Sequence, residues 1–352
     1  MTDSHLVRML DAAANRAGEG LRVVEDYARF VMDDRHLTKQ FKLLRHDLAQ
    51  VLSSVDLSAR CAARETQHDV GTKITTAGEQ QRSDLSDLWA ANIARSQQAL
   101  RSLEESAKLL DADLAIRLES LRYRSYTLAA AMATTREGSR RLAGVRLYVL
   151  VDGRKSLSDF RQFIQRLMAA NVGAVQLRDK RLGDRKLLDR ARWLREITQG
   201  QDTLFIVNDR PDIARLAGAD GVHVGQEELS VKDVRSIVGV DRLIGVSTHT
   251  LEQARQAVLD GANYIGVGPT FPSPTKSFES HTGMDLLKAV AEDVRIPAFA
   301  IGGIGLENIF DVVACGIGRV AVSSALTAAD DPSEVAQRLL RALGPVRDAS
   351  PA

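Results

Sequence analysis

Residues 221–248 read GVHVGQEELSVKDVRSIVGVDRLIGVST and contain the unit that repeats through the C-terminal part of the chain. The two ends, GVHV (221–224) and LIGVST (243–248), are short apolar, β-branched runs typical of buried strands. The segment between them, 230–239, suits a helix. A strand, a helix and a second strand in this order predict two parallel strands joined by a crossover.

The same unit recurs after about residue 142. Apolar runs predict eight strands, at 146–152, 174–180, 204–209, 221–224, 243–248, 264–269, 298–303 and 319–324. The segments between them that suit helices include 156–170, 184–199, 230–239, 250–260 and 283–293. Eight strand–helix units close into a barrel, so we predict a (β/α)₈ TIM barrel over 145–345.

The first 135 residues have a different pattern. No proline occurs before Pro211, and apolar residues fall three or four positions apart in 36–53, namely Leu37, Phe41, Leu44, Leu48 and Val51. Similar spacing predicts further helices over 6–33, 84–110 and 113–134, whereas 60–83 is expected to be a long ordered loop. The fold class is therefore α/β, with an all-α N-terminal domain (1–135) and a polar linker (136–144) before the barrel.

The composition of the 352 residues is ordinary, with 44% hydrophobic and 26% charged residues. A net charge of +1 favours neither nucleic acid nor an anionic membrane as a partner. No apolar run approaches the ~18 residues of a membrane span and no signal peptide is evident, so we expect a cytoplasmic protein. The two cysteines, Cys61 and Cys315, are interpreted as small buried hydrophobic residues and not as a disulfide or metal pair.

The active site of such a barrel lies at the carboxyl ends of its strands. Gln176, Arg178 and Lys180 alternate along the second predicted strand and so lie on one side of it. A guanidinium and an ammonium group suit phosphate oxygens. A charged strand end that faces solvent explains this pattern equally well.

Carboxylates follow the next two strands. Asp209 stands with Asn208 before Pro211, and Glu228 lies in GQEEL (225–229). A carboxylate at a barrel mouth can hold Mg²⁺ bridged to a diphosphate, because Mg²⁺ takes few protein ligands together with substrate oxygens. The alternatives are helix capping by Asn208 or Asp209 and an acidic start to the following helix.

Hydroxyls and glycines end the remaining strands. Ser247 suits substrate binding or helix capping, and His223, inside a strand, is interpreted as a packing residue and not a ligand. The loop GPTFPSPTK (268–276) predicts a proline-stiffened anion clamp. The pairs 302–303 (Gly-Gly) and 323–324 (Ser-Ser) end the last two strands, where these barrels usually bind phosphate, although Gly302 also suits a tight turn.

Together these groups predict two anionic substrates, one at the phosphate site and one beside the carboxylates and their metal. No Cys or Ser–His pair indicates a nucleophile with its base, and no dinucleotide-binding glycine pattern precedes a helix. The chemistry that these groups favour is displacement of diphosphate and not hydrolysis by a triad.

The order of the motifs resembles one family closely. QLRDK, VNDR, DGVHVGQEEL, IGVSTHT, YIGVGPTFPSPTK, AIGGI and VAVSSA span nearly all of 145–327 and are similar to the successive motifs of thiamine-phosphate synthases. In that family a pyrimidine-methyl diphosphate loses diphosphate, and the nitrogen of a thiazole phosphate captures the resulting cation. The products would be thiamine phosphate and diphosphate, made in thiamine biosynthesis.

The resemblance also implies roles for individual residues. The pyrimidine diphosphate would be bound by Gln176, Leu177, Arg178, Asp179, Lys180, Asn208, Ser247 and Lys276. The thiazole phosphate would be bound by Ser273, Pro274, Thr275, Gly303, Ser323 and Ser324. Mg²⁺ would be held by Asp209 and Glu228, and the expected catalytic residues are Lys180, Ser247 and Lys276.

Two positions depart from the family pattern. Glu228 replaces the usual Asp, which keeps the charge but adds a methylene and so changes the metal geometry. Ser273 replaces the usual Thr and keeps the hydroxyl, so little change is expected there.

The N-terminal half resembles a helical domain that is fused to some of these synthases and is associated with phosphorylation of hydroxymethylpyrimidine phosphate. NRAGEGLRVVEDYARF (15–30), LRHDL, RETQHDVGT, NIARSQQALRSLEE and LRYRSYTL carry this resemblance. The polar residues of interest are Asn15, Arg16, Glu19, Arg22, Arg45, His46, Arg64, Asp69, Asn92 and Arg95, for which a solvated helix face is the alternative. No P-loop is present, so the kinase activity is implied by the resemblance alone.

Three rival interpretations remain open at this point. A thiazole tautomerase-like barrel would bind thiazole phosphate without making thiamine phosphate, but it has no diphosphate to bind and so no need of QLRDK, Asp209 and Lys276. A ligand sensor would bind phosphate without turnover. The helical half alternatively serves only for oligomerisation, and the sequence leaves a homo-oligomer open.

Overall fold

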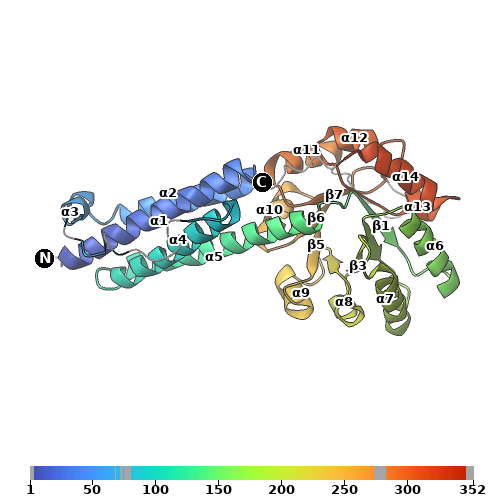
Figure 1. Ribbon diagram of the computed structural model, residues 1–352, viewed down its shortest axis with the longest axis horizontal. Helices are drawn as coiled ribbons and strands as arrows, with labels where there is room; N and C mark the ends of the chain where they lie inside the picture. Colours follow the sequence, from blue (N-terminus) through green and yellow to red (C-terminus); the bar gives the residue numbers. More distant parts are fainter. Residues whose placement is uncertain (1–3, 68, 72–73, 75–80, 273–282, 346–352) are drawn as a thin grey trace. The chain divides into compact units, whose positions relative to one another are not determined.

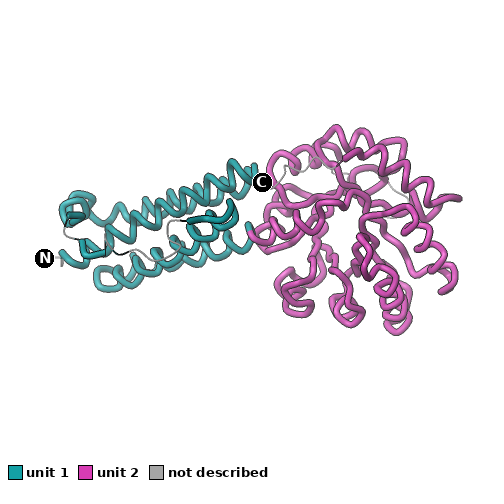
Figure 2. Tube along the Cα trace, viewed as in Figure 1, with its two compact units in different colours: residues 1–132, 349–352 teal, residues 133–348 magenta. Residues whose placement is uncertain are grey.

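The computed structural model describes residues 4–345 except 68, 72–73, 75–80 and 273–282. It consists of two compact units, one ending at Met132 and the other beginning at Ala133 (Figure 2). No helix in the described ranges is long and apolar enough to cross a membrane.

The first unit is helical, as predicted (Figure 1). Its helices are α1 (Ser4–Phe30), α2 (Arg35–Leu52), α3 (Leu57–Ala62), α4 (Leu85–Ala107) and the first part of α5 (Ala112–Arg141). The main contacts of α1 are with α4 and α2, and the apolar stripe predicted in α2 is buried. The sequence fixes where two helices begin, because the side chains of Asp34 and Asp84 accept hydrogen bonds from the N–H groups of Leu37 and Asp87.

Three local predictions differ from the structure. Residues 60–62 belong to α3 and not to a loop, because Asp56 caps a short helix there. Cys61 on this helix is exposed, since α3 buries none of its residues, whereas Cys315 is buried as expected.

The expected linker over 136–144 also differs, because residues 136–141 continue α5. No proline interrupts this stretch, and Arg140 donates two hydrogen bonds, of 2.8 and 2.7 Å, to the carboxylate of Glu137 one turn earlier. Gly138 lies so close to the backbone of Asn263 that a Cβ atom would collide with it. The end of α5 after Met132, which belongs to the second unit, therefore packs against Asn263 of that unit at a residue whose missing side chain allows close approach.

The second unit is the predicted barrel, a closed sheet of eight parallel strands in chain order with helices around it (Figure 1). The strands are β1 (Leu147–Val151), β2 (Ala174–Leu177), β3 (Leu204–Asn208), β4 (Gly221–Val224), β5 (Leu243–Thr248), β6 (Tyr264–Val267), β7 (Ala298–Ile301) and β8 (Val320–Val322). The helices are α6 (Leu157–Ala169), α7 (Asp184–Thr198), α8 (Pro211–Ala217), α9 (Val231–Val238), α10 (Leu251–Leu259), α11 (Gly283–Asp293), α12 (Ile309–Ala314), α13 (Ser324–Thr327) and α14 (Pro332–Leu343).

The strand register determines which residues reach the mouth of the barrel. The interior is filled by one residue from most strands, namely Tyr148, Ala174, Ile206, Leu243, Tyr264, Phe299 and Ala321. Side chains alternate along a strand, so positions two or four residues further on also face inward. Such positions are occupied by Gln176, Asn208, Ser247 and Ser323. The alternation therefore places polar side chains at the carboxyl ends of the strands, next to an apolar core.

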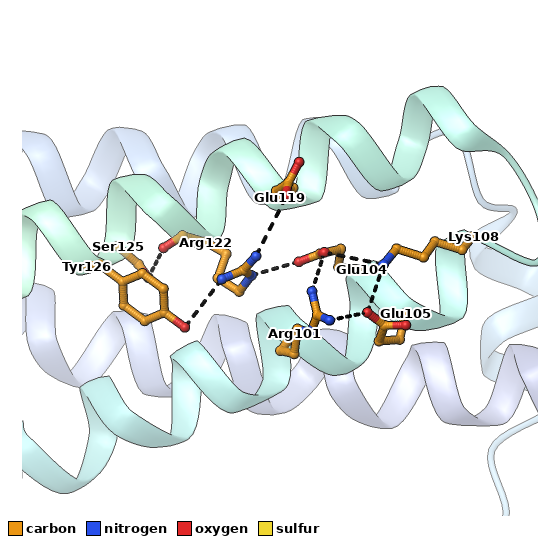
Figure 3. Close-up of polar contacts among 8 residues, drawn as sticks. All are labelled: Arg101, Glu104, Glu105, Lys108, Glu119, Arg122, Ser125 and Tyr126. Carbon is orange, nitrogen blue, oxygen red and sulfur yellow. Dashed lines mark hydrogen bonds and ion pairs between the residues drawn. The ribbon is translucent and has the colours of Figure 1, made fainter.

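A buried ion pair joins α4 to α5 within the helical unit (Figure 3). The Nε atom of Arg122 donates to the Glu104 carboxylate at 2.6 Å, and both side chains are at most 9% exposed. This hydrogen bond holds the pKa of Arg122 above its usual value. Arg101 and Lys108 contact the same carboxylate but are half exposed.

We predict that Glu104→Ala lowers the free energy of unfolding of the helical unit by about 1–3 kcal/mol, because it removes the buried partner of Arg122 and leaves only the longer contact, of 3.8 Å, with the carboxylate of Glu119 at the surface. Urea denaturation of the full chain, followed by far-UV circular dichroism, measures this change. Glu105→Ala is the matched control, since Glu105 also pairs with Arg101 and Lys108 but lies at the surface. Equal effects of the two substitutions would contradict the assignment.

Candidate active site at the barrel mouth

Gln176 lies inside the barrel at the end of β2. Its side chain is only 2% exposed, and its Nε2 atom donates to the hydroxyl of Tyr148 at 2.7 Å. Its Oε1 atom is buried and accepts no hydrogen bond from the part of the chain that the structure describes. A buried acceptor without a donor is unfavourable by about 1–3 kcal/mol, so this oxygen is a candidate contact for a ligand.

The neighbours of Gln176 have different environments. Leu177 is buried and faces the opposite side of β2, so a substrate would meet its backbone and not its side chain. The strand ends there, three residues before the predicted end, although the Arg178 N–H still donates to the carbonyl of Val151. Lys180 is 64% exposed, and its Nζ atom lies 3.8 Å from an Asp209 carboxylate oxygen.

Asp179 shapes the loop after β2. Its carboxylate accepts hydrogen bonds from the N–H groups of Gly153, Arg181 and Leu182 at 2.7–3.0 Å. Burial raises the pKa of Asp179, but these three hydrogen bonds and the charge of Arg181 outweigh it, and the pKa lies below its usual value. With its oxygens occupied in this way, Asp179 positions the loop on which Lys180 stands.

Asp209 follows β3 in a left-handed conformation with φ of 58°, and its N–H donates to the carbonyl of His223 at 2.8 Å. Burial, and then the charge of Glu228, raise the pKa of its carboxyl, whereas Lys180 lowers it less. The Glu228 carboxylate lies over Gly225, where a side chain would collide with it. Two carboxylates with one exposed ammonium group therefore share this edge of the mouth, and their repulsion favours a cation between them.

The helix caps rule out several of the alternative roles. Arg210 occupies the N-cap position of α8 and no side chain caps this helix, so neither Asn208 nor Asp209 does. Ser230 caps α9 and Thr250 caps α10. The carboxylate of Glu228 and the hydroxyl of Ser247 consequently remain for the site.

His223 is buried in the interior, as its interpretation as a packing residue requires. Its Nε2 atom lies 3.0 Å from the Ser247 hydroxyl, and its Nδ1 atom lies 3.3 Å from the hydroxyl of Tyr264. Burial and the nearby charge of Arg178 lower the pKa of His223 to about 4. The imidazole is therefore neutral at pH 7.

The loops after β6, β7 and β8 meet at the expected phosphate site. Gly302 and Gly303 have φ of 101° and 63°, and a Cβ atom on Gly303 would collide with Phe271 and Pro272. Glycine is required at these positions for two reasons, because the backbone is left-handed and because the loop after β6 approaches closely. The Ser323 hydroxyl donates to the carbonyl of Leu150 at 3.2 Å.

The loop residues predicted to bind both phosphates lie outside the described residues. They are Ser273, Pro274, Thr275 and Lys276. Ser324, the remaining member of the predicted phosphate site, is exposed at the start of α13.

The helical unit brings part of its predicted set together around two buried acids of α1. Asp11 accepts two hydrogen bonds from Arg64, at 2.7 and 2.9 Å, and one from Asn15 at 3.2 Å. Glu25 accepts from Arg45 at 2.8 Å and from Arg22 at 3.4 Å.

The other predicted residues of this unit are not in these two groups. Asp69 pairs with Arg8, and Asn92 donates to the carbonyl of Leu88. Within the described ranges no ion pair or side-chain hydrogen bond is present for Arg16, Glu19, His46 and Arg95.

Four residues of the two sites are not predicted from the sequence, two in the helical unit and two in the barrel. Asp11 lies on the apolar face of α1 with Val7, Leu10 and Ala14, and a carboxylate on such a face is the sequence feature that would have indicated it. Glu25 shows the same signal beside Leu21 and Val24. Tyr148 and Tyr264 gave no comparable signal, because a tyrosine in a strand is common.

Both units are similar to known proteins. Residues 147–326 match the family model for thiamine monophosphate synthase, and residues 8–131 match the ThiD2 family model. The thiamine-phosphate synthase of Rhodopirellula baltica is 47% identical over 334 residues, which cover 92% of this chain and 89% of that protein. The thiamine-phosphate synthase of Gloeobacter violaceus is 41% identical over 338 residues, 96% of this chain and 97% of that protein.

A solved structure supports the barrel assignment. The thiamine phosphate pyrophosphorylase from Pyrococcus furiosus is 31% identical with a TM-score of 0.52, and the match covers 58% of this chain and 97% of that one. Residues 8–131 before the barrel match the ThiD2 family model, and the chain as a whole belongs to the thiamine-phosphate synthase family of transferases in thiamine biosynthesis.

Proposed function

We propose that the barrel condenses 4-amino-2-methyl-5-(diphosphooxymethyl)pyrimidine with 4-methyl-5-(2-phosphooxyethyl)thiazole to form thiamine phosphate and diphosphate. The observation that carries this proposal is the carboxylate pair Asp209 and Glu228 with Lys180 beside it at the mouth. A barrel that only isomerised a thiazole phosphate would have no diphosphate for these groups to hold.

The carboxylate pair suits Mg²⁺. Burial, and then the charge of Glu228, raise the pKa of Asp209 even with Lys180 beside it, and carboxylate oxygens are the ligands that Mg²⁺ prefers. No cluster of three His, Cys, Asp or Glu side chains that could hold a metal occurs in the described ranges, so substrate oxygens and water would complete the coordination. When bound, Mg²⁺ would neutralise charge on the diphosphate.

The chain's own groups then serve the departure of diphosphate. The C–O bond to the diphosphate breaks with its electron pair leaving on oxygen, and the thiazole nitrogen donates its lone pair to the resulting cation. Arg178 and Lys180 stabilise the negative charge that develops on the leaving group. The thiazole nitrogen carries no proton, so the site requires no general base.

The thiazole phosphate is assigned to the loops after β7 and β8. Gly303 allows a phosphate to approach the backbone, and the Ser323–Ser324 pair begins α13 beside it. This arrangement would place the two substrates on adjacent parts of one mouth, with the thiazole nitrogen near the carbon that loses diphosphate.

We predict that purified protein forms thiamine phosphate from both substrates only with Mg²⁺, and that Asp209→Ala lowers kcat/KM by about 100-fold or more. Thiamine phosphate measured by fluorescence after oxidation reports the product. Asp212→Ala is the matched control, because Asp212 pairs with Arg210 at the surface of the following helix. Product formed without metal, or full activity in Asp209→Ala, would refute the assigned roles.

We propose that the helical unit is a kinase that supplies the pyrimidine diphosphate. The ThiD2-family match over residues 8–131 and the resemblance of its motifs to those of the fused kinase domains support this. The Asp11–Arg64 pair is the charged group of this unit that we expect to contact the phosphate or to position a residue that does.

This second activity is testable in the full chain with the barrel silenced by Asp209→Ala. We expect ATP consumption that depends on hydroxymethylpyrimidine phosphate, and a loss of about tenfold or more on Arg64→Ala, as for one charge-assisted hydrogen bond. Arg117→Ala, at an exposed position of α5, is the control. Folded protein that consumes no ATP with this substrate would eliminate the kinase proposal and leave an oligomerisation role to examine by light scattering.

A further inference from the structure

Five side chains form a hydrogen-bonded chain across the barrel interior. Gln176 Nε2 lies 2.7 Å from the hydroxyl of Tyr148, and the two tyrosine hydroxyls, of Tyr148 and Tyr264, lie 3.0 Å apart. The hydroxyl of Tyr264 lies 3.3 Å from His223 Nδ1, and His223 Nε2 lies 3.0 Å from the hydroxyl of Ser247. The chain thus connects β2, β1, β6, β4 and β5 in turn.

The three interior members are built into the core. Tyr148, Tyr264 and His223 are at most 7% exposed. The Tyr148 and Tyr264 rings pack edge-on against Phe299, with centroids 5.3 and 5.7 Å apart. Gly245 makes room for both Tyr264 and His223, since a Cβ atom there would collide with either ring. These positions leave the ends, Gln176 and Ser247, as the members nearest a ligand.

Each hydroxyl has a single proton, so the hydrogen bonds of this network run in one direction when every tyrosine proton is used within it. In the arrangement observed at Gln176, its amide donates to Tyr148, Tyr148 donates to Tyr264, and Tyr264 donates to His223 Nδ1. A neutral imidazole then carries its proton on Nε2 and donates to Ser247. In this direction the network ends in an acceptor, Gln176 Oε1, on one side and in the hydroxyl proton of Ser247 on the other. Neither of these two groups has a partner among the five side chains.

The reverse direction needs a different orientation of the Gln176 amide. If Ser247 donated to His223, the protons would run the other way and Tyr148 would donate to Gln176. The Gln176 amide would then have to turn by half a rotation, so that its oxygen faces Tyr148 and its NH₂ faces the ligand. The orientation of the Gln176 amide thereby determines whether the Ser247 hydroxyl donates a hydrogen bond to a ligand or to His223.

We infer that Tyr148, Tyr264 and His223 are positioning residues that couple Gln176 to Ser247, so that the pyrimidine diphosphate meets an acceptor at Gln176 and a donor at Ser247 together. The inference rests on the proposed synthase function, in which the exocyclic amine of the pyrimidine is the donor and its diphosphate the acceptor. A ligand with this pair of groups selects the observed direction of the chain. None of the three positioning residues needs to contact the substrate.

The kinetic test is Tyr148→Phe and Tyr264→Phe in the full chain, because phenylalanine keeps each ring in the core but removes the hydroxyl. We expect the KM for the pyrimidine diphosphate to rise about three- to tenfold, as for one lost hydrogen bond. The KM for the thiazole phosphate should stay unchanged. Tyr123→Phe, in the helical unit, is the matched control and should change neither. Unchanged KM for the pyrimidine in both core variants, or equal increases for both substrates, would overturn the inference.

A second measurement reads the direction of the chain without catalysis. In protein with ¹⁵N-labelled histidine, assigned with His223→Gln, the pyrimidine diphosphate should place the His223 proton on Nε2, and this preference should weaken in Tyr264→Phe. A proton on Nδ1 in the bound state would refute the proposed direction. Wild-type protein that binds the pyrimidine with the Nε2 tautomer but makes no product would instead refute the synthase proposal and leave the coupling standing.

Discussion

Closure of the parallel sheet between β1 and β8 is the constraint on which the barrel and its site depend. Once the strands pair in register around the ring, alternation alone decides that Tyr148, Ala174 and Ile206 fill the interior and that Gln176 and Asn208 stand at the mouth. A slip of one residue in β2 would put Leu177 where Gln176 now stands. The amide of Gln176 would then face outward, toward the surrounding helices, and the site would lose it.

The electrostatics of the mouth follow from the same geometry. Asp209 and Glu228 come from loops after neighbouring strands, so their carboxylates meet at one edge, and burial makes their repulsion stronger than it would be in water. Cations of the β2 loop lie at the same end, where Asp179 fixes the backbone of the loop through three N–H groups. Polar groups that carry no charge, such as Gln176 and His223, lie deeper, where an ion would be costly to bury.

The sequence predicted the barrel, the position of every strand and four of the five helices of the first unit, because each has a strong apolar period. The strand-end residues were also predictable, since a parallel barrel gathers them at one end. Two features required the tertiary structure. The link from Tyr148 to Tyr264 joins residues 116 positions apart and depends on the ring of strands. The continuation of α5 through 136–141 depends on Gly138 fitting against Asn263. The polar composition of this stretch predicts a linker instead.

This continuation of α5 has a consequence for dividing the protein. A cut at residue 135 severs a helix within its length and leaves the last carbonyls of the upstream piece without their N–H partners. The downstream piece would lose no strand, but its first helical residues would start without a capping side chain. An insertion after Gly144, past the turn at 142–144, would leave every hydrogen bond of α5 in place, including the one from the N–H of the buried Leu142 to the carbonyl of Gly138.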